Sequence, residues 1–122
     1  MDSKGPSSTS NSQSGREVEA SVLEKAAAML KDCKERWNEQ GLETRLNDAL
    51  GFNNLIWSIF KSEISKGTTP IPVEIRQNLL QLSDFIDKRS EEIKKAPSAD
   101  KMDILININL NIASGLKGVP SD

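Results

Sequence analysis

The chain of 122 residues contains no histidine and a single cysteine, Cys33. Histidine is the commonest general base and metal ligand, so its absence excludes Ser-His and Cys-His nucleophiles and every zinc site that uses imidazole. One cysteine cannot form an intramolecular disulfide, which fits a reducing cytoplasm. We therefore expect no enzyme, no bound metal and no cofactor.

Phosphate-binding loops and membrane spans are also missing. The seven glycines form neither G-x-G-x-x-G nor GxxxxGK[ST]. No stretch approaches the roughly 18 consecutive apolar residues of a membrane span, and the first residues lack the apolar centre of a signal peptide. The 18 Asp and Glu residues outnumber 16 Lys and Arg, which argues against binding RNA through its phosphates. These absences predict a cytoplasmic protein that does not contact membranes.

The sequence divides into a leader, a helical domain and a short tail. Residues 1–15 are rich in Ser with Gly, Pro, Thr and Asn, a composition that predicts a disordered leader. From Arg16 onward apolar residues recur every three or four positions, the period of a helix face. Residues 16–118 therefore form one predicted helical domain, followed by a tail at 119–122. Ser14 is the expected N-cap of the first helix, and Gly41 is its expected end.

Two further helices are predicted at residues 43–66 and 73–95. Gly51 interrupts the first of them at a cost of about 1 kcal/mol against Ala, so we expect it to allow a neighbouring helix to approach closely. The inward faces of the first three helices are predicted to consist of Val18, Val22, Ala26, Leu30, Cys33 and Trp37; of Leu46, Leu50 (or Ala49), Asn53, Trp57, Phe60 and Ile64; and of Ile75, Leu79, Leu82, Ile86 and Ile93.

The last segment, residues 101–116, fits two secondary structures. Apolar and polar residues alternate strictly from Ile106 to Ile112, which is typical of a strand. The same segment also places apolar residues on one helix face, namely Met102, Leu105, Asn109, Ile112 and Leu116. An isolated strand is unstable and no partner strand is present elsewhere, so we predict a helix. The expected fold is all-α, a small four-helix and mainly antiparallel bundle.

This last helix carries more apolar residues than one core can take. Ile104, Ile108 and Ile112 follow one side of the helix, whereas Ile106 and Leu110 lie on another. We predict that one row stays exposed, with Ile106 and Leu110 as the candidates, to form a helix-in-groove complex or to self-associate.

Aromatic and amide side chains leave two further alternatives open. Trp57 and Phe60 belong either to the core or to a groove for a partner helix. The amides of four asparagines either bond across the bundle or point to water; they are Asn53, Asn107, Asn109 and Asn111.

The order of motifs in the second half of the chain is specific. It consists of Ala49-Leu50-x-x-Asn53, Leu55-x-Trp57-x-x-Phe60, Pro70-Ile71-Pro72-x-x-Ile75-Arg76-Gln77-Asn78, Leu82-x-x-Phe85, Pro97-x-x-x-Lys101 and Leu105-Ile106-x-Ile108-Asn109-x-Asn111-Ile112-Ala113-x-Gly115-Leu116. This order resembles the family of the flagellar biosynthesis regulator FlaF of alphaproteobacteria, over roughly residues 16–118. Two positions depart from the family pattern, because Asn54 and Leu110 stand where the family usually has arginine.

The resemblance implies a helical cytoplasmic protein, without enzymatic activity or cofactor, that promotes flagellin production after transcription. It implies a secretion chaperone that binds flagellin and opposes FlbT, a repressor of flagellin mRNA translation. Two alternatives stay open: a regulator that contacts flagellin mRNA itself, and an adaptor that acts mainly through FlbT. The predicted partner-binding residues are Asn53, Asn54, Trp57, Phe60, Ile106, Asn109 and Leu110.

Overall fold

The computed structural model describes residues 11–66 and 73–118, with side chains from Glu17 onward. It contains four helices: α2 (Asn11–Glu35), α3 (Leu42–Lys66), α4 (Val73–Lys95) and α5 (Met102–Gly118), the last preceded by a short 3-10 turn, η1 (Ala99–Lys101). These two described stretches include no strand, so the all-α prediction and the helical assignment of residues 101–116 are confirmed.

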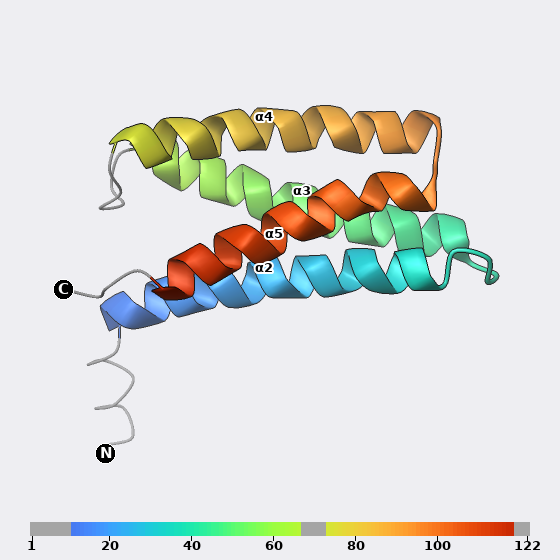
Figure 1. Ribbon diagram of the computed structural model, residues 1–122, viewed down its shortest axis with the longest axis horizontal. Coiled ribbons are helices and arrows are strands. Elements are labelled where there is room, and N and C mark those ends of the chain that lie inside the picture. Colours follow the sequence, from blue (N-terminus) through green and yellow to red (C-terminus); the bar gives the residue numbers. More distant parts are fainter. Residues whose placement is uncertain (1–10, 67–72, 119–122) are drawn as a thin grey trace, which may run out of the picture.

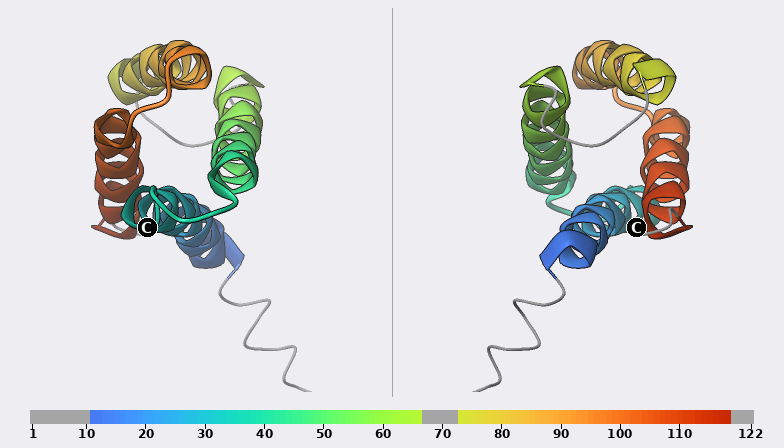
Figure 2. Two further views of the ribbon diagram at one scale, coloured as in Figure 1. Left: turned by 90° about the vertical axis from the view of Figure 1, so that its right-hand side faces the viewer. Right: turned by 90° about the vertical axis from the view of Figure 1, so that its left-hand side faces the viewer.

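The helices run alternately in opposite directions and form an antiparallel bundle (Figure 1). Seen end-on, they occupy the corners of a square in chain order, so that α2 lies beside α3 and α5 (Figure 2). Exposed ion pairs join neighbouring helices. Lys34 of α2 lies 2.6 Å from Asp103 of α5, and Lys61 of α3 lies 3.1 Å from Asp84 of α4. The hydrogen bond that the Lys34 ammonium donates to the Asp103 carboxylate raises the pKa of Lys34. Within the described residues, no helix combines the length and apolar character that crossing a membrane requires.

The predicted bounds of α3 and α4 are correct to within one residue, whereas α2 differs at both ends. It begins at Asn11, inside the segment assigned to the leader, so Ser14 is not its N-cap. The rest of the predicted leader, residues 1–10, and the tail at 119–122 lie outside the described residues. At the other end α2 stops at Glu35 and turns lead to Gly41, whose φ is +84°.

Arg45 explains why the chain leaves the helix before Gly41. Its guanidinium donates hydrogen bonds to the carbonyl oxygens of Arg36, Glu39 and Gln40, at 2.8, 3.0 and 2.6 Å. These three carbonyls belong to the turn that follows α2, so one side chain that binds all of them stabilises the turn.

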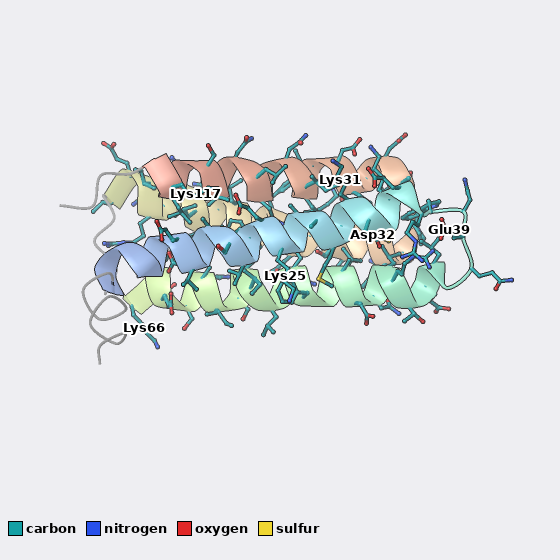
Figure 3. All side chains as sticks on the ribbon, turned by 90° about the horizontal axis from the view of Figure 1, so that it is seen from below. Lys25, Lys31, Asp32, Glu39, Lys66 and Lys117 are labelled. Atoms are coloured by element: carbon teal, nitrogen blue, oxygen red, sulfur yellow. The ribbon has the colours of Figure 1, made fainter. Side chains whose placement is uncertain are left out.

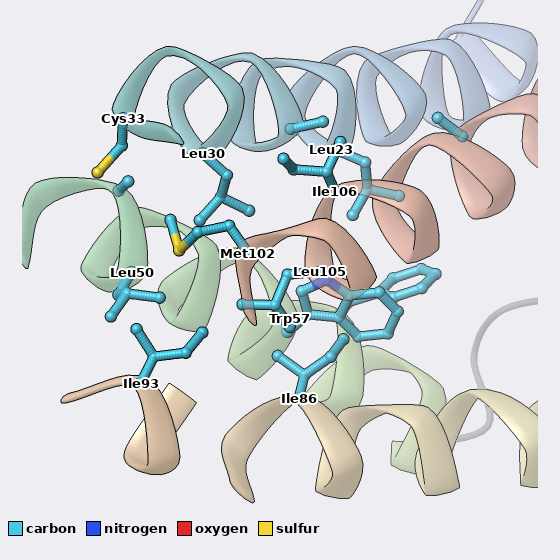
Figure 4. Packing of buried hydrophobic residues seen from close by; sticks show 14 of the residues in the cluster. Leu23, Leu30, Cys33, Leu50, Trp57, Ile86, Ile93, Met102, Leu105 and Ile106 are labelled. Atoms are coloured by element: carbon cyan, nitrogen blue, oxygen red, sulfur yellow. The ribbon is translucent and has the colours of Figure 1, made fainter. Parts of the chain in front are cut away.

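The core lies between all four helices (Figure 4). In α3 the predicted inward face is confirmed completely, including the buried amide of Asn53. Trp57 is 1% exposed and lies near Leu105 of α5 and Ile86 of α4 (Figure 4). Its ring meets that of Phe60 edge to face, with centroids 5.4 Å apart. Aromatic pairs in this geometry favour the buried state beyond the area they remove from water.

The predicted inward face of α2 is partly wrong. Val18 is 57% exposed and Val22 is half-buried, whereas Ala20 and Ala27 are buried instead. α2 packs most closely against α5, where Ala113 is also buried. Small side chains on both helices let the two backbones approach, so the alanines rather than the valines face the core.

The predicted inward face of α4 is confirmed for Leu79, Ile86 and Ile93 and wrong for two other residues. Ile75 is 48% exposed and Leu82 is half-buried, whereas Ser83 and Ser90 are buried. The Ser90 hydroxyl donates a hydrogen bond of 2.9 Å to the amide oxygen of Asn54 on α3. A buried serine is therefore accommodated because its hydroxyl has a partner.

Gly51 does not allow the close helix approach predicted for it. A Cβ atom at this position would meet no neighbouring atom within 4 Å. The glycine faces open space on α3, so the predicted role is wrong.

Candidate functional site

Most of the predicted partner-binding residues lie in the core. Leu110 is 44% exposed and Asn54 is half-buried, but the other five are at most 8% exposed: Asn53, Trp57, Phe60, Ile106 and Asn109. The expectation that Ile106 belongs to an exposed row is therefore wrong. Ile106 points between α2 and α5, because the helix turns it onto the same face as Met102 and Ala113. Phe60 reaches a surface hollow between α2 and α3, whereas the other four side chains can touch a partner only if the bundle opens.

Three of the buried side chains form a polar chain through the centre of the bundle. The Trp57 indole Nε1–H donates to Asn109 Oδ1 at 2.7 Å, and Asn109 Nδ2 donates to Asn53 Oδ1, also at 2.7 Å. Asn53 Nδ2 has no partner among the described residues. Two of the amides thus bond across the bundle, whereas Asn107 and Asn111 are exposed. This chain links α3 to α5 and fixes their relative register.

A second apolar stripe runs along α3 beside the buried one. Its residues Phe52, Leu55, Ile56 and Ile59 are spaced i, i+3, i+4 and i+7, which places them on one face of the helix. Leu55 is 56% exposed and Ile59 is 49% exposed, while Phe52 and Ile56 are half-buried. The predicted stripe of α3 did not include them. Their spacing is visible in the sequence and was the available signal.

Ile56 and Ile59 of the second stripe line one wall of an apolar hollow between α2 and α3, whereas Phe52 and Leu55 are not among its lining residues. Figure 3 shows α2 in front, with α3 on one side of it and α5 on the other. The hollow has a volume of about 440 Å³ and is lined almost entirely by apolar side chains, with two carboxylates: Val18, Val22, Leu23, Ile56, Ile59 and Phe60, with Glu19 and Glu63. Val18 and Val22, which the core does not use, are thus the α2 wall of this hollow.

A second hollow of about 340 Å³ lies further along the same pair of helices. It is lined by Lys25, Ala28, Met29 and Asp32 of α2 and by Arg45, Asp48 and Ala49 of α3. We call the surface formed by both hollows the α2/α3 groove. Between the hollows the Lys25 ammonium lies 5.3 Å from the centre of the Phe52 ring.

The cations of the α2/α3 groove are engaged within the protein, whereas two of its carboxylates are not. Lys25 lies over an aromatic ring and Arg45 binds three carbonyl oxygens. Asp48 and Glu63 are exposed and have no ion pair among the described residues. The charge that the groove offers to a ligand is therefore negative.

Other described surfaces have fewer features of a binding site. Leu110 lies on the α2-facing side of α5, between the ion pairs made by Asp103 and Lys117. Phe85 on α4 is 38% exposed and is partly covered by the Arg89 guanidinium, 5.6 Å from its ring centre.

Cys33 is buried, and burial raises the pKa of its thiol, so it is a poor nucleophile. The described side chains include no group of three His, Cys, Asp or Glu residues placed to hold a metal ion.

Comparison with known proteins identifies the family. No curated protein and no solved structure matches the sequence. The family model described as "Flagellar protein FlaF" matches residues 6–116, which include all of α2, α3 and α4 and most of α5. The match begins ten residues before the predicted domain. The chain therefore belongs to the FlaF family of flagellar proteins.

Proposed function

We propose that this protein promotes flagellin production in the cytoplasm by binding flagellin before export, as a chaperone without catalytic activity. The observation that carries the proposal is the second apolar stripe of α3, of which Leu55 and Ile59 are about half exposed. Membership of a family of flagellar proteins supports a role in flagellum biogenesis, and the exposed stripe supports a role in binding another protein.

The chemistry of an unassembled flagellin fits such a surface. Flagellins polymerise through amphipathic terminal helices, so a subunit that waits for export has an apolar helical face that needs cover. Two antiparallel helices leave a groove between them, and a third helix packs there by inserting its side chains between theirs. Withdrawing the exposed half of Ile59 from water contributes on the order of 1 kcal/mol.

The arrangement of charge favours a protein partner over RNA. Many basic side chains of the described surface already pair with carboxylates, among them Lys34, Lys61, Arg89, Lys94 and Lys117. RNA binding through phosphates needs a cluster of cations that are free to replace counterions. An adaptor that acts mainly through FlbT would use the same kind of apolar surface, so only the identity of the partner separates it from the chaperone.

The test is direct binding of purified full-length flagellin, measured by isothermal titration calorimetry. We expect a one-to-one complex that also delays flagellin polymerisation, and we expect binding to be lost when the terminal helices of flagellin are removed. Gel shifts with flagellin leader RNA and calorimetry with FlbT serve as controls. Binding to RNA or to FlbT, without binding to flagellin, would contradict the proposal.

A further inference from the structure

We infer that the α2/α3 groove binds one amphipathic α-helix of about four turns, and that basic residues flank the apolar stripe of this helix. The inference rests on the proposed function only for the identity of the protein that carries the helix. The site, the secondary structure of the ligand and its charge follow from the groove itself.

The length of the groove sets the length of the ligand. Val18 lines one hollow and Asp32 lines the other. The 14 residues between these positions on α2 correspond to about 21 Å at 1.5 Å per residue, or roughly four helical turns. The exposed wall of α3 has the i, i+3, i+4, i+7 spacing that interlocks with another helix. An extended peptide has no sheet edge to join, since the described elements are all helical.

The charge of the ligand follows from the free carboxylates. Glu63 and Asp48 lie 15 residues apart on α3, which is about 22 Å along the helix axis. Both are exposed, whereas the two cations that line the groove are held by Phe52 and by backbone carbonyls. Lys or Arg residues near both ends of the bound helix would pair with these carboxylates, while acidic residues there would be repelled.

Two other occupants fit the groove less well. Residues 1–10 of this chain, MDSKGPSSTS, include only Met1 as a sizeable apolar side chain, so they cannot fill two hollows. A second copy of the protein would bring another acidic groove edge against Glu63 and Asp48. Like charges placed together in this way disfavour self-association.

The first experiment uses three labelled peptides of about 15 residues, the length of four turns, with the full-length protein and fluorescence anisotropy as the readout. One peptide has a leucine stripe flanked by lysines, the second has the same stripe flanked by glutamates, and the third has the lysine composition with the leucines scrambled. We expect the first to bind about tenfold more tightly than the other two at low salt, and its advantage over the second to shrink at high salt because the charges are screened. Equal binding of the first two peptides would overturn the charge assignment.

The second experiment locates the site with matched variants. We expect Ile59→Asp to weaken binding of the lysine peptide about tenfold or more, because it places a charge in the apolar wall. Leu110→Asp is the control, since it makes the same change at a comparably exposed residue of α5. Glu63→Lys should weaken binding, whereas Asp87→Lys, at an exposed carboxylate on α4, should not. Val18→Ser tests the α2 wall if Ile59→Asp reduces helicity.

The outcomes separate this inference from the proposed function. If Ile59→Asp and Val18→Ser both bind the lysine peptide as the wild type does, the groove is not the site. The inference also fails if the wild type forms a dimer that Ile59→Asp dissociates, because the occupant is then a second copy. If flagellin binds the wild type and the groove variants equally, the chaperone proposal stands and the groove assignment fails. If the lysine peptide binds through the groove but flagellin does not bind, the groove assignment stands and the partner is another protein.

Discussion

The buried chain of Trp57, Asn109 and Asn53 predicts that the two asparagines contribute very differently to stability. Asn109 makes two hydrogen bonds in this chain, whereas Asn53 makes one and leaves Nδ2 without a partner. Leucine has the same branching at Cγ as asparagine and is larger, so replacement by leucine removes the polar contacts without creating a cavity. We expect Asn109→Leu to destabilise the protein markedly and Asn53→Leu to change its stability little.

The expected magnitudes follow from counting unpaired groups. Asn109→Leu leaves both the Trp57 indole N–H and Asn53 Oδ1 buried without a partner, at about 2 kcal/mol each. Burying a leucine offsets about 2 kcal/mol of this loss, so the net cost is about 2 kcal/mol. Asn53→Leu leaves only Asn109 Nδ2 unpaired, at about 2 kcal/mol, and it also removes a donor that is already unpaired. The gain from the buried leucine cancels this loss, and the removal of the unpaired donor makes Asn53→Leu as stable as the wild type or slightly more stable.

Urea unfolding followed by far-UV circular dichroism measures both changes in the free energy of unfolding. We expect the double variant Asn53→Leu/Asn109→Leu to be at least as stable as Asn109→Leu alone, because only the indole N–H is then unpaired. This non-additivity is characteristic of groups in one hydrogen-bond network. An Asn53→Leu variant that loses as much stability as Asn109→Leu would refute the reasoning, since it would mean that Asn53 is as fully bonded as Asn109.

Three further predictions concern single residues. Gly51→Ala should raise the free energy of unfolding by about 1 kcal/mol, because the added methyl group meets open space and alanine favours helix; an unchanged thermal melting curve would contradict this. Cys33 should react with Ellman's reagent only after unfolding, since it is buried and burial raises the pKa of its thiol; rapid reaction of the folded protein would show otherwise. Ile106→Asp should unfold the bundle whereas Leu110→Asp should not, as circular dichroism will report; two folded variants would place Ile106 outside the core.

Local signals in the sequence were sufficient to predict α3, α4 and α5. Gly67, the two prolines after it and Pro97 interrupt the apolar periodicity, so the helices between them were bounded correctly. The inward face of α3 was also predictable, because its large apolar residues dominate one side of the helix. The assignment of α5 as a helix required one tertiary argument, namely that a single strand would have had no partner.

The contacts between helices decided what local patterns left open. On α2, periodicity fits the valines at 18 and 22 as well as the alanines at 20 and 27, and only the close packing of α5 buries the alanines. Contacts between helices also decide the location of the predicted partner-binding residues. A periodic pattern predicts that an apolar residue is shielded from water, but it does not show whether a helix of this chain or a partner packs against it. This is why Ile106, Trp57 and Phe60 were assigned to a binding surface and lie in the core.

The two apolar stripes of α3 show most clearly what the sequence determines and what the tertiary structure determines. The sequence by itself determined that α3 is a helix with apolar residues on more than one side, since both stripes have helical spacing. Only the tertiary structure decided that Trp57 and its neighbours face the core while Leu55 and Ile59 remain exposed, with Ile59 beside α2. The physical reason is geometric: in a bundle of four helices each helix buries one face, so a second apolar face stays available to a partner.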